Sequence, residues 1–244
     1  MKNTKIIKAF KNSEDSNHGQ LIPLPQNLHY TLIGIMLGDG FLYRSSPTSN
    51  TRFEMSFGSS YKQFVESIGN LYSNYMKTPV KVLEIKGKDK VYLNFRLKTT
   101  ILPIFNQYYD MFYKLNTETG KYVKIIPRNI LDHLNSVVLV PLPCLPRSPR
   151  GGGGRHLRDT GHLIMTDGNF DKNRKRVRIY TNSYSKEDVE RLATAINIKL
   201  GISVGVLHDR KDQWILTIGA KQLSLLRDTI SPHFESSMLY RIGL

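Results

Sequence analysis

The stretch Leu32-Ile33-Gly34-Ile35-Met36-Leu37-Gly38-Asp39-Gly40 is an apolar run of helical length that ends on an acid followed by a glycine. A carboxylate at the C-terminal end of a helix is unfavourable by roughly 0.3–1 kcal/mol, because the helix dipole is negative there. Asp39 therefore needs a compensating partner, and a divalent cation is one candidate. Taken alone, the stretch also fits an ordinary buried helix with a glycine after its last turn.

The same ending occurs again in the second half of the chain. Leu163-Ile164-Met165-Thr166-Asp167-Gly168 closes a second apolar run on Asp-Gly, and a methionine precedes the acid in both copies. Further matches continue through the two halves at nearly constant spacing: Val65-Glu66 with Val189-Glu190, Val82-Leu83 with Val206-Leu207, and Asp89–Phe95 with Asp212–Ile218. The two acids therefore occupy corresponding places in two copies of one structural unit.

Hydrophobic periodicity indicates the elements of that unit. Alternation of polar and apolar residues predicts strands at 52–57, 80–85 and 91–97, and the polar stretch after Gly40 is expected to be a loop. Apolar residues at helical spacing predict helices at 31–38, 62–75 and 101–115. The fold class is therefore α+β, with a sheet backed by helices in each repeat.

The charge of the chain points to a polyanionic partner. Lys and Arg number 35 against 20 Asp and Glu, which gives a formal net charge of +15 and a pI of about 9.8. Such an excess of positive charge is typical of nucleic-acid-binding proteins. No apolar run reaches the ~18 residues of a membrane-spanning helix. The single Cys144 excludes an internal disulfide and a cysteine-rich zinc site, so any metal is expected to have oxygen ligands.

Composition also divides the chain. Residues 1–27 form a lysine-rich arm without a signal peptide, 28–138 the first repeat, and 160–244 the second repeat. Between them, 139–159 contains four closely spaced prolines and Gly151–Gly154, which predicts a linker or an insertion. This insertion replaces the beginning of the second motif helix. Asp159 or Thr160 could cap a shorter helix, and His162 would then stand near the helix interface.

On these residues the chain resembles the single-chain, two-motif LAGLIDADG homing endonucleases. The resemblance covers about residues 28 to 244 and implies two pseudo-symmetric repeats, each with an antiparallel DNA-binding saddle sheet, joined at an interface of the two motif helices. Gly34 would allow close approach of these helices, so that Asp39 and Asp167 lie side by side. These two acids, with Gly38 and Thr166, would then hold Mg²⁺ or Mn²⁺ for phosphodiester hydrolysis.

The family resemblance also implies one basic residue per half beside the metal. Lys124 precedes an Ile-Ile-Pro segment, as the family's lysine precedes its Ile-Pro, and Arg241 lies where a lysine is typical near the C-terminus. Together with Asp39 and Asp167, these two residues form the predicted catalytic set. Lys98 and Lys221, which the repeat itself pairs, are the alternatives. Ordinary surface charge is the other explanation for Lys124 and Arg241.

Side chains on the outer faces of the two sheets would contact DNA. The predicted set is Arg52, Glu54, Ser56, Lys81, Tyr92, Asn94 and Arg96 in the first half, and Arg174, Lys175, Arg176, Arg178, Tyr180, Asn182 and Thr217, with His208 as a further candidate, in the second. Phosphate contacts would set the register, and side chains in the major groove would read base edges.

Three functions are consistent with these features. The first is a monomeric site-specific endonuclease that cuts both strands of a long asymmetric DNA target. The second is a maturase that binds intron RNA, because some members of the resembled family act in splicing. The third is a DNA-binding relic that the insertion has inactivated. The resemblance implies a mitochondrial or chloroplast location, although no targeting signal is visible.

Overall fold

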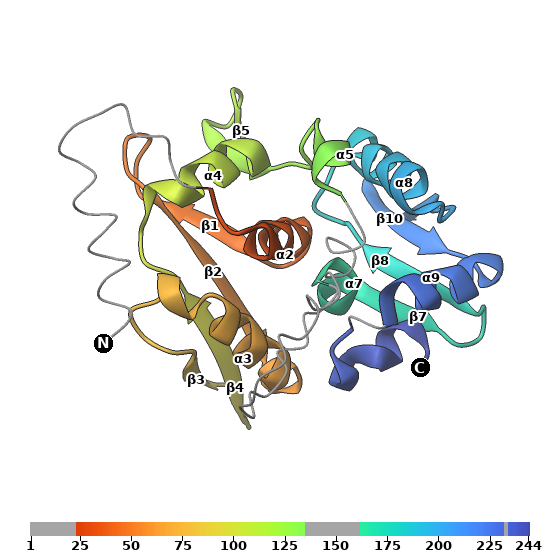
Figure 1. The fold of residues 1–244 in the computed structure, drawn as a ribbon, viewed down its shortest axis with the longest axis horizontal. Coiled ribbons are helices and arrows are strands. Elements are labelled where there is room, and N and C mark those ends of the chain that lie inside the picture. Colours follow the sequence, from red (N-terminus) through yellow and green to blue (C-terminus); the bar gives the residue numbers. More distant parts are fainter. Residues whose placement is uncertain (1–22, 135–161, 232–233) are drawn as a thin grey trace, which may run out of the picture. The chain divides into compact units, whose positions relative to one another are not determined.

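The computed structural model describes residues 23–134, 162–231 and 234–244 (Figure 1). Their contacts divide the chain into two units. One contains Gly40–Tyr109 and the chain up to Leu28, and the other contains His29–Asp39 and Asp110–Leu244. Two predicted segments lie outside the described residues: the linker at 139–159, which contains Cys144, and residues 1–22 of the N-terminal arm.

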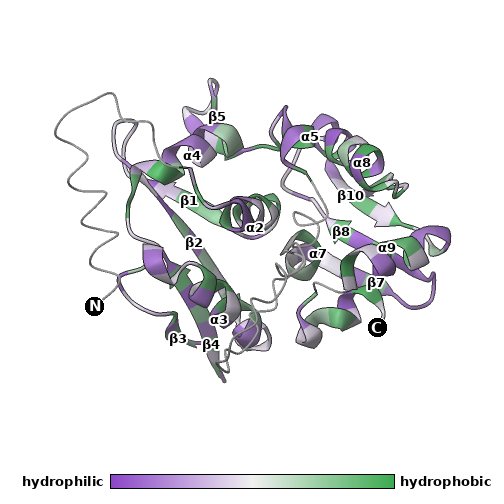
Figure 2. Cartoon of the chain, in the orientation of Figure 1, coloured by the Kyte–Doolittle hydropathy of each residue, from purple (hydrophilic) through white to green (hydrophobic). Residues whose placement is uncertain are grey.

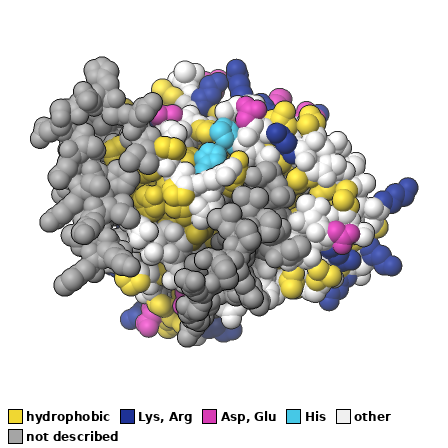
Figure 3. Space-filling model, in the orientation of Figure 1, with side chains coloured by type: hydrophobic (Ala, Val, Ile, Leu, Met, Phe, Trp, Pro, Cys, Tyr) yellow, Lys and Arg dark blue, Asp and Glu magenta, His cyan; other side chains and the backbone are white. Residues whose placement is uncertain are grey.

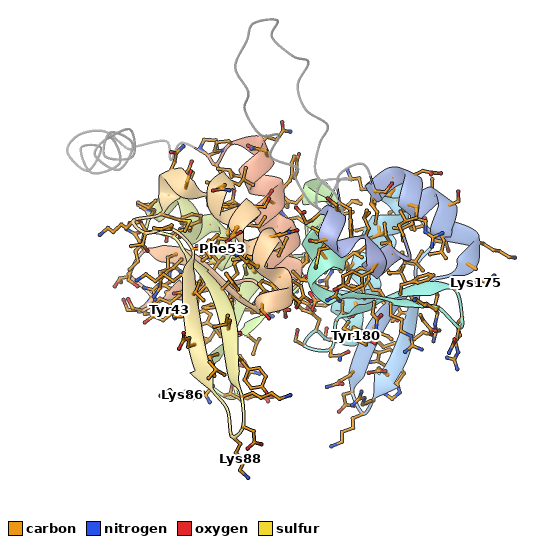
Figure 4. The ribbon with its side chains drawn as sticks, turned by 90° about the horizontal axis from the view of Figure 1, so that it is seen from below. Tyr43, Phe53, Lys86, Lys88, Lys175 and Tyr180 are labelled. Atoms are coloured by element: carbon orange, nitrogen blue, oxygen red, sulfur yellow. The ribbon has the colours of Figure 1, made fainter. Side chains whose placement is uncertain are left out.

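The first unit is built on a four-stranded antiparallel sheet. Its strands are β1 (Phe41–Arg44), β2 (Thr51–Gly58), β3 (Lys81–Lys86) and β4 (Val91–Lys98), in the order β1-β2-β4-β3. The predicted alternation is present in β2, where Phe53, Met55 and Phe57 are buried. In Figure 4, Phe53 lies between the sheet and the helices, whereas Lys86 and Lys88 project from the far end of the β3–β4 hairpin.

Helix α3 (Lys62–Leu71) covers the inner face of this sheet. The predicted apolar stripe is present, since Phe64, Val65 and Ile68 are buried, and Figure 2 shows hydrophobic and hydrophilic residues alternating around the helix. The helix is shorter than predicted, because a 3-10 turn, η2 (Ser73–Tyr75), follows it. Another 3-10 turn, η1 (Ser59–Tyr61), links β2 to α3.

The second unit contains a sheet of the same design. Its strands are β7 (Gly168–Asp171), β8 (Arg176–Tyr180), β9 (Gly205–Arg210) and β10 (Gln213–Ile218), in the order β7-β8-β10-β9. Helix α8 (Lys186–Leu200) packs on β9 and β10, followed by η4 (Ala220–Gln222), α9 (Leu223–Ile230) and η6 (Ser236–Ile242). The identical strand order confirms the repeat and the predicted α+β class.

Sequence periodicity missed part of the connection between the sheets. The predicted helix at 101–115 is a 3-10 turn, η3 (Pro103–Phe105), then α4 (Asn106–Phe112), and it ends where the hairpin of β5 (Tyr113–Asn116) and β6 (Lys121–Lys124) begins. The reason is local turn chemistry: Asn116 Oδ1 accepts hydrogen bonds from the backbone of Glu118 and Thr119, and Gly120 adopts a φ of +64°. The short α5 (Ile130–His133) follows.

The stretch after Gly40 also differs from the prediction. The predicted polar loop is present at residues 45–50, but it begins later than expected, because residues 41–44 form β1, which pairs with β2 at the edge of the sheet. The first motif helix, α2 (Gln26–Leu37), begins directly after Pro25, earlier than predicted, and the second, α7 (His162–Asp167), has six residues. In the described part of the chain, no helix has the length and apolarity needed to cross a membrane.

Candidate active site and nucleic-acid interface

The first acid lies just beyond a fully buried helix end. Leu32, Ile33, Ile35, Met36 and Leu37 are each at most 1% exposed. The hydroxyl of Tyr184 donates to the carbonyls of Met36 and Leu37, at 3.2 and 3.1 Å, and so satisfies two of the acceptors that a helix leaves open at its C-terminus. Asp39 follows two residues later, at the surface, on a backbone that is anchored immediately before it.

The second acid is the last residue of α7. The hydroxyl of Thr166 lies 3.1 Å from the Leu163 carbonyl and 2.7 Å from Asp167 Oδ2, which fixes the carboxylate against the helix. Arg241 Nη1 donates to the carbonyl of Gly168, the next residue. Asp167 is thus held from both sides, although its helix is short. The side chain of His162, predicted near this interface, lies outside what the structure describes.

The two acids come together in the second unit. A Cβ placed on Gly38 would overlap the side chains of Thr166 and Asp167, so the end of the first motif runs directly against the second. This close approach occurs at Gly38, and the one expected at Gly34 stays a prediction. The pKa of Asp167 is raised by burial and, after it, by the negative charge of Asp39.

Lys124 lies beside the two acids. Its Nζ donates to the Gly38 carbonyl at 2.6 Å from the end of β6. Burial lowers the pKa of Lys124 to about 8, and the negative charges of Asp167 and Asp39 oppose that shift. Both predicted basic residues therefore bind the glycine carbonyl next to one of the acids, Lys124 beside Asp39 and Arg241 beside Asp167.

The pKa values of both acids are raised above the ordinary value of an aspartate. Burial is the main cause that raises the pKa of Asp167 to about 7, and the charge of Asp39 adds to it, against the opposing effects of Thr166, Lys124 and Arg241. Although the Asp39 side chain reaches the surface, the protein around its carboxylate partly shields it from water and raises its pKa, while Lys124 and Arg241 act in the lowering direction. Two neighbouring carboxylates that resist joint ionisation are suited to a shared cation.

The donor set fits a hard divalent ion. Within the described ranges, no three His, Cys, Asp or Glu side chains form a group that could hold a metal. The neighbouring carboxylates of Asp39 and Asp167 are two charged oxygen donors. Mg²⁺ is commonly bound by one or two carboxylates and keeps several waters or substrate phosphate oxygens. The adjoining backbone carbonyls of Gly38 and Thr166 are of the same oxygen class. Zinc, which favours nitrogen and sulfur ligands, fits less well.

The outer face of the first sheet carries the predicted DNA-contacting residues. Arg52 and Ser56 on β2, Lys81 on β3, and Tyr92, Asn94 and Arg96 on β4 all retain at least partial exposure. Glu54 lies on the same face but is only 1% exposed, and its carboxylate is bound by the cations of neighbouring residues. Its direct contact with a base is therefore not supported by the structure.

The second sheet presents a similar face. Arg176 and Arg178 are partly exposed and Tyr180 more fully, while the alternate residues Val177 and Ile179 are buried. Figure 4 shows Lys175 at the turn between β7 and β8, where Arg174 also lies. Figure 3 shows Lys and Arg side chains at several points of the surface, among small separate hydrophobic patches.

Three remaining candidates occupy different positions in the second unit. Thr217 pairs with Arg178 across β10 and β8, and Thr217 Oγ1 and Arg178 Nε are buried with no hydrogen bond to any residue that the structure describes. Asn182 follows the end of β8 and is exposed. His208 on β9 packs edge-on against Trp214, with 5.0 Å between ring centroids. Lys221, the alternative basic residue, lies in η4, and Lys98, the other, ends β4 beside Glu54.

Sequence reasoning missed the residues that hold this site in place. Besides Tyr184, the carboxylate of Asp188 accepts the Ile126 backbone N–H at 3.1 Å, and Arg191 Nη1 donates to the Ile126 carbonyl at 2.8 Å and to Asp188 at 2.6 Å. This pair fixes the segment that follows Lys124. A Ser-x-x-Asp pattern at the start of α8 gave a signal for Ser185 as the helix cap, but no pattern indicated the contact with Ile126.

Two saddle-like antiparallel repeats with a pair of acids at the ends of two apolar helices define a LAGLIDADG-type protein. The sequence profile of the LAGLIDADG DNA endonuclease family matches residues 30–142 and 160–226, and the chain belongs to this family.

Individual relatives agree with this assignment. The chain is 25% identical over 250 residues to the cytochrome b mRNA maturase bI2 of Saccharomyces cerevisiae, covering 99% of this chain but only 53% of that protein. It is 25% identical over 249 residues to the probable intron-encoded endonuclease 1 of Wickerhamomyces canadensis, covering 98% and 91%. The homing endonuclease I-WcaI, solved bound to its DNA recognition sequence, has the same fold, with a TM-score of 0.74, 21% identity, and coverage of 98% and 92%.

Proposed function

We propose that this chain is a site-specific double-strand DNA endonuclease that uses Mg²⁺ or Mn²⁺ held by Asp39 and Asp167. The observation that carries the proposal is the meeting of these two carboxylates with Lys124 and Arg241 in one unit. Family membership supports the reaction class, and the basic outer faces of the two sheets support DNA as the substrate.

Each residue of the site would have a separate role in the reaction. Asp39 and Asp167 would hold the cation, with the carbonyls of Gly38 and Thr166 as neighbouring oxygen donors. Such an ion supplies Lewis acidity toward phosphate oxygens and lowers the pKa of bound water. Lys124, with a pKa of about 8, keeps a positive charge beside the phosphate and exchanges its proton near neutral pH. Arg241 would stabilise negative charge that develops on the phosphate oxygens.

DNA binding would use both sheets of one chain. Arg174 and Lys175 are suited to phosphate contacts, and the partly exposed side chains of β2, β4 and β8 are suited to base edges in the major groove. Since the two sheets carry different side chains, the target would be long and asymmetric, and one chain would suffice as a monomer. Binding should weaken steeply with salt, because counterions are released when phosphates are neutralised.

The test uses a DNA duplex with the sequence of the site at which the gene for this chain is inserted, without the insertion. Purified protein with Mg²⁺ should cut both strands of a duplex that carries the uninterrupted insertion site. Asp39→Asn and Asp167→Asn should each reduce cleavage by a factor on the order of 10³ or more while binding stays nearly intact, since each removes a charged metal donor. Wild-type protein that binds this duplex without nicking it would instead indicate a binding-only relic.

RNA splicing is the second candidate function. The observation in its favour is the similarity to a yeast protein named as a cytochrome b mRNA maturase. A maturase would promote splicing of its host intron RNA, and the Asp39→Asn variant would keep that activity, because the metal donors are not required for RNA binding. Splicing assays with wild type and this variant would separate the two functions.

The compartment is proposed to be mitochondrion or chloroplast, and the working form a monomer. The intron-encoded fungal relatives support an organellar setting. Fluorescence of a tagged chain in the host and light scattering of the purified protein would measure location and mass. A nuclear signal or a stable dimer would contradict these proposals.

A further inference from the structure

One buried carboxylate gathers three cations on the outer face of the first sheet. Glu54 Oε1 lies 2.5 Å from Arg52 Nε and 3.5 Å from Lys98 Nζ, and its Oε2 lies 2.5 Å from Arg96 Nη2. Glu54 is 1% exposed, whereas Arg96 and Lys98 are 39% and 43% exposed. Burial alone would raise the pKa of Glu54, but the hydrogen bonds from Arg96 and Arg52 outweigh it and lower the pKa, so the group is an anion at neutral pH.

The sheet register explains why these side chains meet. Lys98 is the cross-strand partner of Glu54, and Arg96 lies on the diagonal beside it, opposite Ser56. Arg52 is two residues along β2 on the same face, and its guanidinium also lies over the ring of its cross-strand partner Tyr43, at 4.2 Å. Arg52 is thus fixed by a carboxylate at one edge and an aromatic ring on one face.

The ion pairs leave donors of both arginines available. Glu54 takes Nε of Arg52 and Nη2 of Arg96, and within the described chain the two Nη groups of Arg52 and the Nε and Nη1 groups of Arg96 make no hydrogen bond. Arg52 keeps the parallel N–H bonds of its two Nη groups, and the second N–H of Arg96 Nη2 is parallel to an N–H of its neighbour Nη1 or Nε. Such a pair of parallel donors matches the O6 and N7 acceptors of guanine. A guanidinium that is already held in one orientation loses less conformational entropy when it binds.

The second sheet contains a weaker version of this arrangement. Asp171 accepts from Arg176 Nε at 3.3 Å and lies 3.2 Å from Arg178 Nη2, but Asp171 is 20% exposed and ends an edge strand. Its contacts are longer and more open to water, so they hold the arginines less firmly. The first sheet is therefore the better site for rigid base recognition.

We propose that Glu54 is a specificity-determining positioning residue: it does not touch DNA but holds Arg52 and Arg96 so that they recognise guanines in the half-site bound by the first sheet. This inference rests on the proposed DNA-binding function. Because the carboxylate is recessed beneath the arginines, it organises them without presenting its own charge to the phosphates. Loss of Glu54 should therefore reduce selectivity more than overall affinity.

The test is selection from a random-sequence DNA duplex pool with wild type, Glu54→Gln and the control Glu66→Gln. Glu66 is an exposed carboxylate, 4.0 Å from Lys62, so this control makes the same chemical change away from the sheet face. Wild type and control should enrich one motif. Glu54→Gln should lose base preference at guanine positions in one half of that motif only. Its affinity for the wild-type site should fall by on the order of 10-fold to 100-fold, with little change for a scrambled duplex.

The outcomes separate the possible explanations. An unchanged motif from Glu54→Gln, or equal loss in both halves, overturns the assignment and leaves Glu54 with a purely structural role. No motif from wild type would instead count against the proposed sequence-specific function. If Glu54→Gln fails to fold by circular dichroism, Arg52→Lys and Arg96→Lys serve in its place. They keep the charge but lose the planar fork, and each should relax one guanine position; full retention of those positions overturns the inference.

Discussion

The two motif helices each place an acid in the candidate active site, but different contacts hold the two helices. Helix α2 has 12 residues and a fully buried apolar end, and its acid lies two residues beyond the helix at the surface. Helix α7 has six residues, and its acid is the last helical residue and half-buried. The end of the long helix is held by its packing and by the Tyr184 hydroxyl, whereas the short helix is also held by the contacts of Thr166 and by Arg241 at the Gly168 carbonyl.

The comparison shows that helix length is not what delivers a carboxylate to this site. An isolated six-residue helix is unstable in water, so α7 exists because tertiary contacts hold it. Leu163, Ile164 and Met165 are fully buried, and Gly168 packs so closely on the Ile164 carbonyl that a side chain there would overlap it. A helix of six residues can therefore hold its acid in place where its anchoring contacts remain.

The junction of the two motifs provides the test with the largest expected effect. Gly38→Ala puts a methyl group into the space of Thr166 and Asp167, so it should destabilise the fold by about 1–3 kcal/mol and displace the acid that the short helix presents. Cleavage should fall further than stability. The matched control is Gly219→Ala, since a Cβ there meets nothing within 4 Å. Denaturant unfolding and cleavage assays measure both effects, and equal behaviour of the two variants would contradict the proposed close approach.

Removal of the Tyr184 hydroxyl tests how the long helix is anchored. Tyr184→Phe leaves the carbonyls of Met36 and Leu37 without this donor and should cost about 1–2 kcal/mol in unfolding free energy. It should also weaken Mg²⁺ binding, because Asp39 follows the anchored segment. Titration of Mg²⁺ against protein stability measures this shift. Tyr92→Phe, which alters a 57% exposed ring, is the control for stability. Unchanged metal affinity in Tyr184→Phe would show that α2 needs no such anchor.

A dependence of stability on pH is also expected from Asp167, the acid of the short helix. The pKa of Asp167 is raised to about 7 in the folded chain, so the folded state binds more protons than the unfolded state between about pH 4 and pH 7. Stability of the metal-free protein should therefore fall as pH rises through that window, and the Asp167→Asn variant should lose this contribution.

A divalent cation should counteract the same trend. The ion binds the deprotonated acids, so Mg²⁺ should stabilise the protein more at pH 8 than at pH 5. Denaturant titrations at both pH values, with and without Mg²⁺, measure the difference. If Mg²⁺ stabilised the protein equally at pH 5 and pH 8, metal binding would not require Asp167 to lose its proton.

Much of the fold could be predicted from the sequence, because local hydrophobic periodicity determines which face of a helix or strand is buried. The repeated Asp-Gly endings, the apolar stripe of α3 and the alternation in β2 all reflect local periodicity, and the structure contains them. The paired strand orders follow from the repeat. The edge strand β1 and the β5–β6 hairpin were missed because they are only four residues long, too short for a periodic signal.

The supporting contacts could not be predicted for a different reason. Tyr184 and Asp188 act on backbone atoms of residues far away in the sequence, so no local pattern records the partner. Glu54 has the alternation of a surface residue, yet three cations cover it. Alternation predicts which face a side chain lies on, but whether that side chain reaches solvent depends on its neighbours across the strands.

The division of the contacts also has a consequence for protein engineering. Residues 29–39, which end in the first acid, cluster with Asp110–Leu244 and not with the sheet that follows them in sequence. A hybrid enzyme made by exchanging sequence-defined halves would therefore separate this helix end from Tyr184 and Lys124, the residues that hold it. Exchange of Gly40–Tyr109 alone would replace the proposed DNA-recognition face of the first sheet and leave the proposed metal site with its native partners.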